Sequence, residues 1–359
     1  MLSLSYLTRV VFKGSDVEPC LVLEKAPIPD IEDGEILGKI LLATICGSDI
    51  HTIEGRRKEA VPSVLGHEGV ITVVKHKRPD SDLKPGDRLT FHIADCCYDC
   101  DFCAEGLHQK CTSLFKYGHA SLSDGTGSNG CYATHLVIRK GTHVAKIPPA
   151  ISNKLASPLN CALATMVCAT EEIIQTQSKG TKRVKRAMIQ GAGLLGVYGC
   201  VLLKEAGYDQ VYCSDIDSRR LETVIKFGAI PVLSGESGVD FPEDNSVDVV
   251  IEVCGQRSVV SEGMKKIRIG GTYILIGMVH PDSKLDMLTG EQIIRKCLTI
   301  KGFHNYGPSH LDKAVSLLAN TANKYPYEEL LSPSFPLADI NNAVAMATKQ
   351  TYLRVCIEP

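Results

Sequence analysis

The sequence of 359 residues contains no tryptophan, and aromatic residues make up only 6% of it. It also has no long uninterrupted apolar run, at the N-terminus or elsewhere, which argues against a secretory signal and a membrane span. Positive and negative side chains nearly balance, with a net charge of −2, so no charge excess favours nucleic acid or an anionic membrane as a partner. We therefore expect a cytoplasmic protein of about two domains.

Cysteine, in contrast, is abundant, with 15 residues in the chain. Reducing conditions disfavour disulfides, so clustered cysteines in a cytoplasmic protein indicate metal binding or catalysis. Five of them lie between Cys96 and Cys111. Cys200, Cys254 and Cys356 lie in apolar runs and are expected to be inert core residues.

The pattern of apolar residues changes along the chain and predicts an α/β protein. The first 150 residues or so read as short apolar runs separated by Gly, Pro and Asp, which is typical of a mainly β unit. From about Ser157 onwards, apolar strands alternate with amphipathic stretches, and this alternation favours a doubly wound parallel sheet. We predict a mainly β domain over 1–160, a second domain over 161–299, and a return of 300–359 to the first.

A glycine-rich segment marks a dinucleotide site in the second domain. Gly191-Ala192-Gly193-Leu194-Leu195-Gly196 follows an apolar strand and opens a helix-like stretch. Gly191 allows a tight turn, Gly193 lets the backbone approach a pyrophosphate, and Gly196 lets helix and strand pack closely. The free N–H groups and positive dipole end of the helix would then face the phosphates.

An acidic residue at the end of the next strand indicates which dinucleotide binds. Asp215 lies about 20 residues beyond the glycines, where a carboxylate accepts hydrogen bonds from the adenosine ribose. Its charge would repel the extra phosphate of NADP, so we predict NAD, although Arg219 and Arg220 could soften this preference. The alternative is that Asp215 simply caps the following helix.

A run of four cysteines predicts a structural metal site. Cys97, Cys100, Cys103 and Cys111 are separated by two, two and seven residues. Four thiolates around a tetrahedral zinc ion leave no open position, so such a site is structural. Polar neighbours make the alternative of four buried free thiols unattractive, and Cys96, which breaks the spacing, is expected to be a bystander.

Three further segments could supply a second metal site with an open position. They contain Cys46, His67 and Cys161, and two cysteines with one histidine leave the fourth zinc position free for water or substrate. Each residue has a plainer alternative. His67 could be a turn or core histidine, Cys161 could be a small buried apolar residue with Cys168 competing for its role, and Glu68 could cap a turn.

Together these motifs are similar to a known family. The segments ICGSDIH, GHEG, LKPGDRL, NCALAT and GAGLLG, together with the four-cysteine lobe, occur in the order found in the zinc-dependent medium-chain alcohol dehydrogenases. The resemblance covers essentially the whole chain. It implies a GroES-like catalytic domain with a structural zinc lobe at about 95–113, a Rossmann domain that binds NAD, and a homodimer or homotetramer. It also implies hydride transfer between NAD(H) and a small alcohol or carbonyl substrate.

The resemblance further implies roles for individual residues. The catalytic zinc would be held by Cys46, His67 and Cys161, with Glu68 beside these ligands or a transient ligand itself. Ser48 would hydrogen-bond the substrate alkoxide, His51 would pass its proton to solvent, and Thr165 would lie near the nicotinamide. Cofactor contacts would come from Gly191, Gly193, Leu194, Leu195, Gly196, Asp215 and Arg220, and the structural zinc ligands would be Cys97, Cys100, Cys103 and Cys111.

One position departs from the family pattern. The family usually has a glycine two residues after GHEG, where this chain has Ile71. Isoleucine does not readily adopt a positive φ, so we expect the strand to pack differently there.

The substrate is less well indicated. The segment His304-Asn305-Tyr306 resembles dehydrogenases found with phosphonate-metabolism genes, and Arg56, Arg57 and Lys58 could bind an anionic group such as that of a phosphonate aldehyde. The plainer interpretation of these three residues is a solvated loop. The sequence also leaves open a polyol or threonine-type dehydrogenase, a zinc-free quinone reductase, and a non-catalytic protein that binds zinc and nucleotide.

Overall fold

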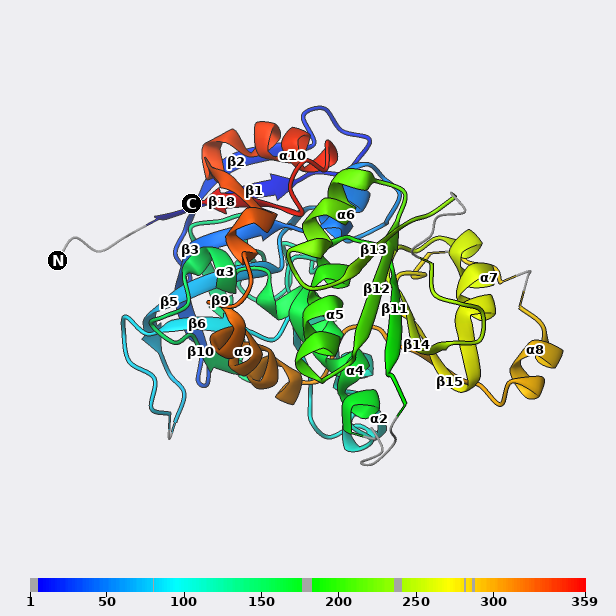
Figure 1. Cartoon of the computed structure of the whole chain (residues 1–359). Helices are drawn as coiled ribbons and strands as arrows, with labels where there is room; N and C mark the ends of the chain where they lie inside the picture. Colours follow the sequence, from blue (N-terminus) through cyan, green and yellow to red (C-terminus); the bar gives the residue numbers. More distant parts are fainter. Residues whose placement is uncertain (1–5, 80, 176–182, 236–240, 281, 286–287) are drawn as a thin grey trace. The chain divides into compact units, whose positions relative to one another are not determined.

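The structure of the protein is a computed structural model, which describes residues 6–79, 81–175, 183–235, 241–280, 282–285 and 288–359 (Figure 1). The chain divides into a first unit, Met1–Ala164 with Gly307–Pro359, and a second unit, Thr165–Tyr306. The boundaries predicted at 160/161 and 299/300 lie a few residues before the observed ones at 164/165 and 306/307. Strand β16 (Thr299–Gly302) belongs to the sheet of the second unit, and this moves the second boundary beyond residue 302. None of the described helices has the length and apolarity needed to cross a membrane.

The first unit is built mainly from short strands, as the punctuated apolar runs predict. Its largest sheet has the order β10-β6-β5-β3-β18-β17, with β9 also paired to β3, and a smaller sheet has the order β2-β1-β4. The strands are β1 (Tyr6–Phe12), β2 (Leu21–Pro27), β3 (Ile36–Ile45), β4 (Ser63–Val64), β5 (Glu68–His76), β6 (Arg88–Phe91), β7 (Ala94–Asp95), β8 (Phe115–Lys116), β9 (His135–Ile138), β10 (Val144–Lys146), β17 (Leu331–Pro336) and β18 (Arg354–Glu358).

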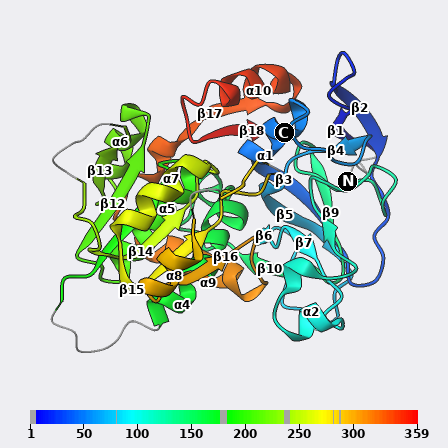
Figure 2. The same ribbon diagram turned by 90° about the vertical axis from the view of Figure 1, so that its right-hand side faces the viewer.

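Short helices connect these strands, and the last part of the chain returns to the same unit. Strand β18 pairs with β3, which places the C-terminal segment beside the strand that leads to Cys46. Figure 2 shows β7 and α2 in a small lobe of this unit. The helical segments are α1 (Gly47–Ile53), α2 (Asp101–Ala104), η1 (His108–Lys110), α3 (Asn153–Ala156), η2 (Leu159–Leu163), α9 (Ser309–Thr321), η3 (Tyr327–Leu330), η4 (Leu337–Asp339) and α10 (Ile340–Thr348).

The unusual Ile71 is accommodated by a glycine on the neighbouring strand. Ile71 is fully buried in β5, and β3 and β5 pair with register shifts on either side of this region. A Cβ atom at Gly38 would lie 2.5 Å from Ile71 Cδ1 and 2.9 Å from Ile71 Cβ. The isoleucine side chain therefore fills the space that a side chain at position 38 would need. The larger residue on β5 is compensated by the absence of a side chain on β3.

Gly38→Ala is expected to destabilise the protein by about 1–3 kcal/mol, because the added methyl group overpacks this contact. The double variant G38A/I71A should recover part of that loss relative to the sum of the single changes, since residues in contact are not additive. Urea unfolding of the wild type, both single variants and the double variant measures the coupling. Strict additivity would show that the two side chains do not compete for one space.

The second unit has the predicted doubly wound parallel sheet. Its six strands are mutually parallel and have the order β13-β12-β11-β14-β15-β16, so the strand order reverses between β11 and β14. The strands are β11 (Arg186–Gln190), β12 (Gln210–Asp215), β13 (Ile230–Leu233), β14 (Val247–Glu252), β15 (Ile267–Leu275) and β16. The helices are α4 (Ala164–Gln175), α5 (Leu194–Glu205), α6 (Ser218–Ile225), α7 (Arg257–Lys266) and α8 (Gly290–Arg295).

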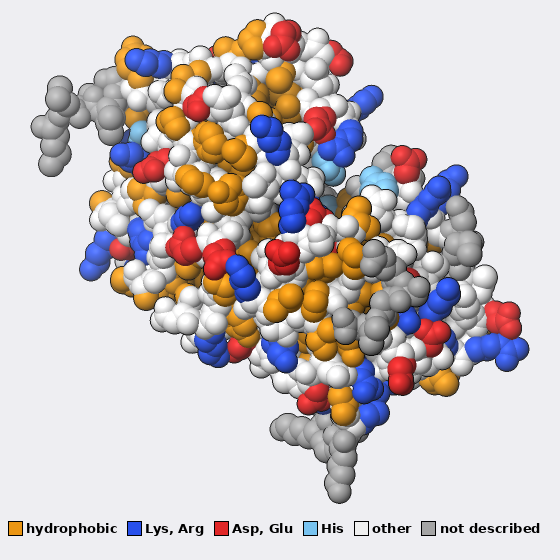
Figure 3. Space-filling view, turned by 45° about the horizontal axis from the view of Figure 1, so that its top comes forward, with side chains coloured by type: hydrophobic (Ala, Val, Ile, Leu, Met, Phe, Trp, Pro, Cys, Tyr) orange, Lys and Arg blue, Asp and Glu red, His pale blue; other side chains and the backbone are white. Residues whose placement is uncertain are grey.

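Helices cover both faces of this parallel sheet. In Figure 1, α5 and α6 lie on one side of the strands and α7 on the other. In such sheets ligands bind beyond the carboxyl ends of the strands, at the point where the order reverses. That point lies next to the glycine-rich segment, which follows β11. At the surface, acidic and basic side chains are intermixed on the face drawn in Figure 3, consistent with the balanced composition.

Candidate active site

Three segments far apart in the sequence bring four metal-ligating side chains together in the first unit. One ligand atom each of Cys46, His67, Glu68 and Cys161 lies within 4.8 Å of all the others. Cys46 follows β3 directly, His67 and Glu68 stand at the start of β5, and Cys161 lies in the π-helical turn η2. Single π-helical turns are frequent at functional sites. The other candidate cysteine, Cys168, is outside this group.

Backbone contacts fix these segments against one another. Thr44 and Glu68 are partners in the antiparallel pairing of β3 with β5. The buried Asn160 side chain, next to Cys161, donates through Nδ2 to the carbonyl oxygens of His67 at 3.0 Å and Phe91 at 2.9 Å. The π-helical turn is therefore tied directly to the strand that carries the histidine.

The two thiols of the group have opposite acidities. The hydrogen bond from Cys161 and the positive charge of Arg354 lower the pKa of Cys46 well below its usual value, although burial opposes this. The same hydrogen bond, together with burial, raises the pKa of Cys161 well above its usual value. One buried thiolate is thus stabilised next to a second sulfur and an imidazole. Two cysteines and a histidine are a ligand set that zinc uses with a fourth position open, so the residues fit this metal.

A buried carboxylate lies beside the histidine. Asp49 Oδ1 lies 3.4 Å from His67 Nδ1. The other oxygen of Asp49 accepts hydrogen bonds from the Cys46 N–H and the Tyr132 hydroxyl, each at 2.9 Å. A histidine that faces a carboxylate through one nitrogen presents the other to a metal ion, an arrangement common around zinc.

Glu68 is paired with an arginine from the far end of the chain. Arg354 on β18 donates from Nε to Glu68 Oε2 at 2.8 Å and from Nη2 to Oε1 at 3.0 Å, and the Thr44 hydroxyl donates to Oε2 at 2.6 Å. Burial raises the pKa of Glu68, and the charge of Arg354 opposes that rise. Arg354 Nη2 also lies 3.5 Å from Cys46 Sγ. Glu68 is therefore part of a buried ion pair and does not merely cap a turn.

Ser48 and His51 lie on helix α1, which begins immediately after Cys46. Ser48 is half-buried and His51 is exposed to solvent. Partial burial and the charge of Arg56 lower the pKa of His51. Among the described residues, no hydrogen bond joins the two side chains. Their separation of three residues nevertheless puts them on one side of the helix.

The glycine-rich segment forms a tight turn between β11 and α5 in the second unit. Gly191 has φ +117°, which side chains rarely tolerate, and Gly193 is the N-terminal capping residue of α5. A Cβ atom at Gly196 would lie 1.9 Å from the carbonyl oxygen of Gly191. The helix thus packs so closely on the turn that only glycine fits, and its first N–H groups face outward from the strand end. Leu194 and Leu195 are the first two residues of this helix.

Asp215 ends β12 and braces the same turn. One carboxylate oxygen accepts the N–H of Ala192 at 2.7 Å, and the other accepts the N–H of Asp217 at 2.9 Å. The residue that caps α6 is Asp217, so the alternative of Asp215 as a helix cap is wrong. Arg220 Nη1 lies 3.7 Å from Asp215, whereas the exposed Arg219 pairs with Asp217.

Asp215→Asn is expected to weaken NAD binding and to shift the ratio of NADP to NAD affinity by about tenfold, because it removes the charge that repels a phosphate. The amide keeps one of the two acceptor oxygens, so one of the backbone N–H groups of Ala192 and Asp217 loses its partner, and a loss of stability of about 1–3 kcal/mol is expected beside the shift in affinity. Dissociation constants for both nucleotides measure the effect, with Asp209→Asn as a control of equal charge change. An unchanged ratio would refute the assignment of nucleotide selectivity to Asp215.

Thr165 lies in the first turn of α4 and is buried. Within the described part of the second unit, no contact ties its side chain to the glycine-rich turn. The position of Thr165 near the nicotinamide stays a prediction.

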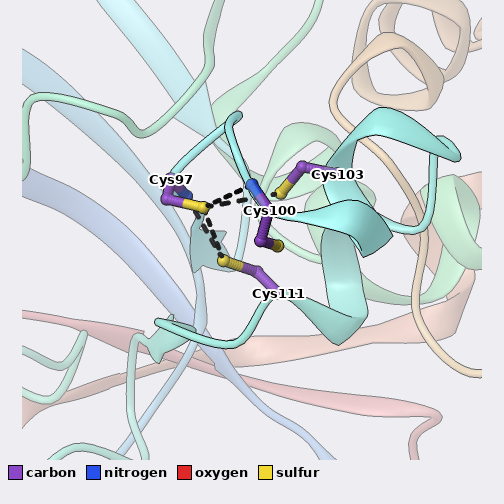
Figure 4. A group of neighbouring side chains, drawn as sticks. All are labelled: Cys97, Cys100, Cys103 and Cys111. Carbon is purple, nitrogen blue, oxygen red and sulfur yellow. Dashed lines mark hydrogen bonds between the residues drawn. The ribbon is translucent and has the colours of Figure 1, made fainter.

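The four cysteines of the lobe point toward one another (Figure 4). Their sulfur atoms all lie within 4.8 Å, with Cys97 Sγ at 3.4 Å from Cys111 and 4.0 Å from Cys103. Zinc–sulfur bonds in tetrahedral geometry require sulfur separations of about 3.8 Å. Backbone N–H groups also donate to these sulfurs, which stabilises thiolates, and those of Thr112 and Cys103 lower the pKa of Cys100 to about 6. Cys96 is buried nearby but stands outside the group.

Comparison with known proteins agrees with both units. Residues 32–149 match the alcohol dehydrogenase GroES-like domain, and residues 161–358, more than half of the chain, match the glucose dehydrogenase C-terminus. An alcohol dehydrogenase from Thermotoga maritima has a similar structure, with a TM-score of 0.88, 26% identity and 99% of each chain covered. The chain belongs to the zinc-dependent medium-chain alcohol dehydrogenase family. It is an NAD-dependent oxidoreductase, as its motifs predict.

Relatives of this dehydrogenase differ in their substrates. A sorbitol dehydrogenase from Bombyx mori is 25% identical, with 93% of this chain and 94% of the relative covered. A D-arabitol-phosphate dehydrogenase from Enterococcus avium is 26% identical, with 92% of each covered. An L-threonine 3-dehydrogenase from Legionella pneumophila is 24% identical, with 91% and 93% covered. These relatives are all dehydrogenases, but their names give different substrates. The assignment to the phosphonate-associated branch of the family stays a prediction.

Zinc in the four-cysteine lobe is expected to support the stability of the dehydrogenase and not its chemistry. Cys103→Ser should lose one equivalent of zinc and lower the melting temperature, while the zinc at the other site and the KM of the remaining active enzyme change little. Metal analysis and thermal melting measure this, with Cys96→Ala as the control that should keep both metals. A Cys103→Ser protein that lost one equivalent of zinc and kept the wild-type melting temperature would contradict this division of roles.

Some residues of the site were missed or misjudged from the sequence. Arg354 and Asp49 were not singled out, although Asp49 lies inside the ICGSDIH motif. Cys254 was expected in the core, but it is exposed. It follows the end of β14, and a Cβ atom at Gly191 would lie 2.9 Å from its Cβ. Cys200 and Cys356 are buried.

Proposed function

We propose that the enzyme transfers a hydride between NAD(H) and a small alcohol or its aldehyde or ketone, using zinc held by Cys46, His67 and Cys161. The observation that carries this proposal is that the ligand atoms of the buried Cys46 and His67 and of the half-buried Cys161 lie within 4.8 Å of one another. Membership of the family supports it. The four-cysteine lobe would hold the second, structural zinc.

The chemistry divides between the bound groups and the chain. When bound, zinc polarises the oxygen of an alcohol or carbonyl group, and NAD(H) accepts or donates the hydride. Ser48 would hydrogen-bond the reacting oxygen and take up its proton in alcohol oxidation. His51, which is exposed on the same helix, would pass this proton to solvent. In the reducing direction the same two residues would deliver a proton.

The surrounding residues would keep the ligand atoms in place. Asp49 would lie against the ring of His67 at Nδ1, and Arg354 would hold Glu68 in place and oppose the rise of its pKa that burial causes. Because Glu68 already makes a bidentate ion pair with Arg354, we propose that it is a neighbour of the zinc ligands and not a permanent ligand itself. Transient coordination of zinc by Glu68 would require this ion pair to break. Nucleotide would be held by the glycine-rich turn, Asp215 and Arg220, with Thr165 near the nicotinamide.

The substrate proposed from the sequence is a phosphonate aldehyde. Its support is the His304-Asn305-Tyr306 segment and the basic residues after His51. Lys301, just before that segment, is paired with Glu172 and is less available for binding. The second candidate is a polyol or an amino-acid alcohol, which the names of the sorbitol, arabitol-phosphate and threonine dehydrogenases favour.

A substrate panel on protein of known zinc content tests the proposal. Alcohols, polyols, threonine and aldehydes should be assayed with NAD(H) and NADP(H), before and after zinc is removed and restored. Turnover should depend on zinc and favour NAD(H). Full activity in protein that lacks zinc at both sites would overturn it.

We also propose a homodimer or homotetramer. The edge strand β16 pairs with β15 on one side only among the described strands, and the nearby Ile269 and Ile294 are 64% and 75% exposed. Exposed apolar residues beside an open strand edge are typical of an interface. Sedimentation analysis of the wild type and Ile294→Glu tests this, and a monomeric wild type would refute it.

A further inference from the structure

We infer that Tyr132 is a positioning residue of the zinc site: its hydroxyl holds the carboxylate of Asp49, which in turn contacts the segments of two proposed ligands, Cys46 and His67. This inference rests on the proposed function, since it takes zinc as the ion bound by these ligands. Tyr132 itself is assigned no contact with zinc or substrate, and it acts on the site through Asp49.

The ring of Tyr132 is fixed by the segment that leads to His67. Tyr132 is fully buried, and its backbone N–H donates to the carbonyl oxygen of Leu65 at 3.0 Å. The N–H of the preceding Cys131 donates to the carbonyl oxygen of Gly66 at 2.8 Å. Gly66 has φ +87°, and a Cβ atom there would lie 2.6 Å from Tyr132 Cδ1. The ring therefore lies directly on the residue before His67, and this packing sets the position of the hydroxyl.

The hydroxyl reaches a carboxylate that belongs to the other ligand segment. Tyr132 donates to Asp49 Oδ2 at 2.9 Å, and the same oxygen accepts the N–H of Cys46 at 2.9 Å. Tyr132 and Asp49 are both buried and lie 83 residues apart in the sequence. Hydrogen bonds to an ionised carboxylate are among the stronger ones in proteins. This bond therefore joins the start of α1, where Cys46 stands, to the segment that carries His67.

Two donors to one oxygen fix how the carboxylate is turned. With Oδ2 held by Cys46 and Tyr132, the other oxygen of Asp49 faces His67 at 3.4 Å from Nδ1. No other described residue gives either of these two facing atoms a hydrogen-bond partner. The terminal torsion of aspartate has a broad energy minimum, so a carboxylate that loses one donor can turn away. Groups behind a metal-binding histidine contribute to metal affinity, so the Tyr132 hydroxyl supports zinc binding through Asp49.

Tyr132→Phe tests this in the full-length enzyme with both zinc sites loaded. The variant keeps the ring that packs on Gly66 and removes only the hydroxyl. It should weaken zinc binding at the Cys46–His67–Cys161 site by about threefold to tenfold and leave the four-cysteine lobe unchanged. Competition with a chromophoric zinc chelator measures the affinity of each site. In enzyme with Co²⁺ at the first site, the visible absorption bands should shift, because they report the arrangement of the ligands.

Tyr327→Phe is the matched control for a lost buried hydroxyl. Tyr327 is buried on η3 in the same unit, with its hydroxyl 2.9 Å from Thr321 Oγ1 and outside the ligand group. This control should lose a comparable amount of stability in urea unfolding and keep the zinc affinity and Co²⁺ spectrum of the wild type. If Tyr132→Phe behaved like the control, Tyr132 would be an ordinary core residue and the inference would be wrong.

A double variant tests whether the hydroxyl acts through Asp49. Asp49→Asn alone should weaken zinc binding, because it removes the charge that faces His67. Adding Tyr132→Phe to Asp49→Asn should then cost much less zinc affinity than it costs in the wild type, since residues that act through one contact are not additive. Equal losses in the two backgrounds would overturn the inference.

Failure of the inference can be told from failure of the proposed function. A wild type that binds one equivalent of zinc, all of which Cys46→Ser retains, would overturn the proposed zinc ligands and this inference with them. A wild type with two equivalents whose zinc affinity and Co²⁺ spectrum are unaffected by Tyr132→Phe keeps the dehydrogenase proposal and overturns only the role of Tyr132.

Discussion

Cys46→Ser is expected to lower turnover by about 10³-fold or more, which corresponds to about 4 kcal/mol of lost transition-state stabilisation. The hydroxyl of serine is a much poorer zinc ligand than a thiolate, and Cys46 is the thiol of the ligand group whose pKa is lowered, whereas that of Cys161 is raised. The protein should lose the zinc at this site and keep that of the four-cysteine lobe. Steady-state kinetics and metal analysis measure both effects.

Binding of NADH provides the internal check on Cys46→Ser. The glycine-rich turn and Asp215 lie in the other unit of the chain, so NADH affinity should stay largely intact. Cys168→Ser is the matched control, because Cys168 competes with Cys161 in the sequence but lies outside the ligand group. It should keep both metals and full turnover. Parallel loss of zinc and NADH binding in Cys46→Ser would show that the cysteine has a structural role instead.

The ligand group could be predicted from the sequence because each member lies in a short local motif. Cys46, His67 and Cys161 are each flanked by residues whose order alone is informative, and the parallel sheet follows from an alternation that spans the second unit. Arg354 has no such signal. It is 286 residues away from Glu68 in the chain, and only the pairing of β18 with β3 brings it there. Contacts that arise from the pairing of strands far apart in the sequence cannot be predicted from a local sequence pattern.

The exchange between Gly38 and Ile71 illustrates the same limit. The sequence shows an isoleucine at position 71, where the family usually has glycine. From that alone we expected altered packing of this strand, but not which residue makes room for the side chain. The structure supplies the partner, because β3 and β5 pair and the glycine on β3 makes the room.

Gly196→Ala is expected to abolish tight NADH binding and to destabilise the second unit by about 1–3 kcal/mol or more. The added Cβ would lie 1.9 Å from the carbonyl oxygen of Gly191, a backbone atom that cannot move aside without opening the turn. Opening the turn would also displace the N–H of Ala192 from the carboxylate of Asp215. Fluorescence titration with NADH and urea unfolding measure the two effects.

Two other glycines make this prediction specific. Gly290 at the start of α8 has nothing within 4 Å of its added Cβ, so Gly290→Ala should leave both NADH affinity and stability unchanged. Gly193 has the same free space in the protein alone, yet we expect a pyrophosphate to approach its backbone. Gly193→Ala should therefore keep its stability and still lose NADH affinity. If Gly193→Ala bound NADH normally while Gly196→Ala did not, the turn would be needed for folding and the phosphates would have to bind elsewhere.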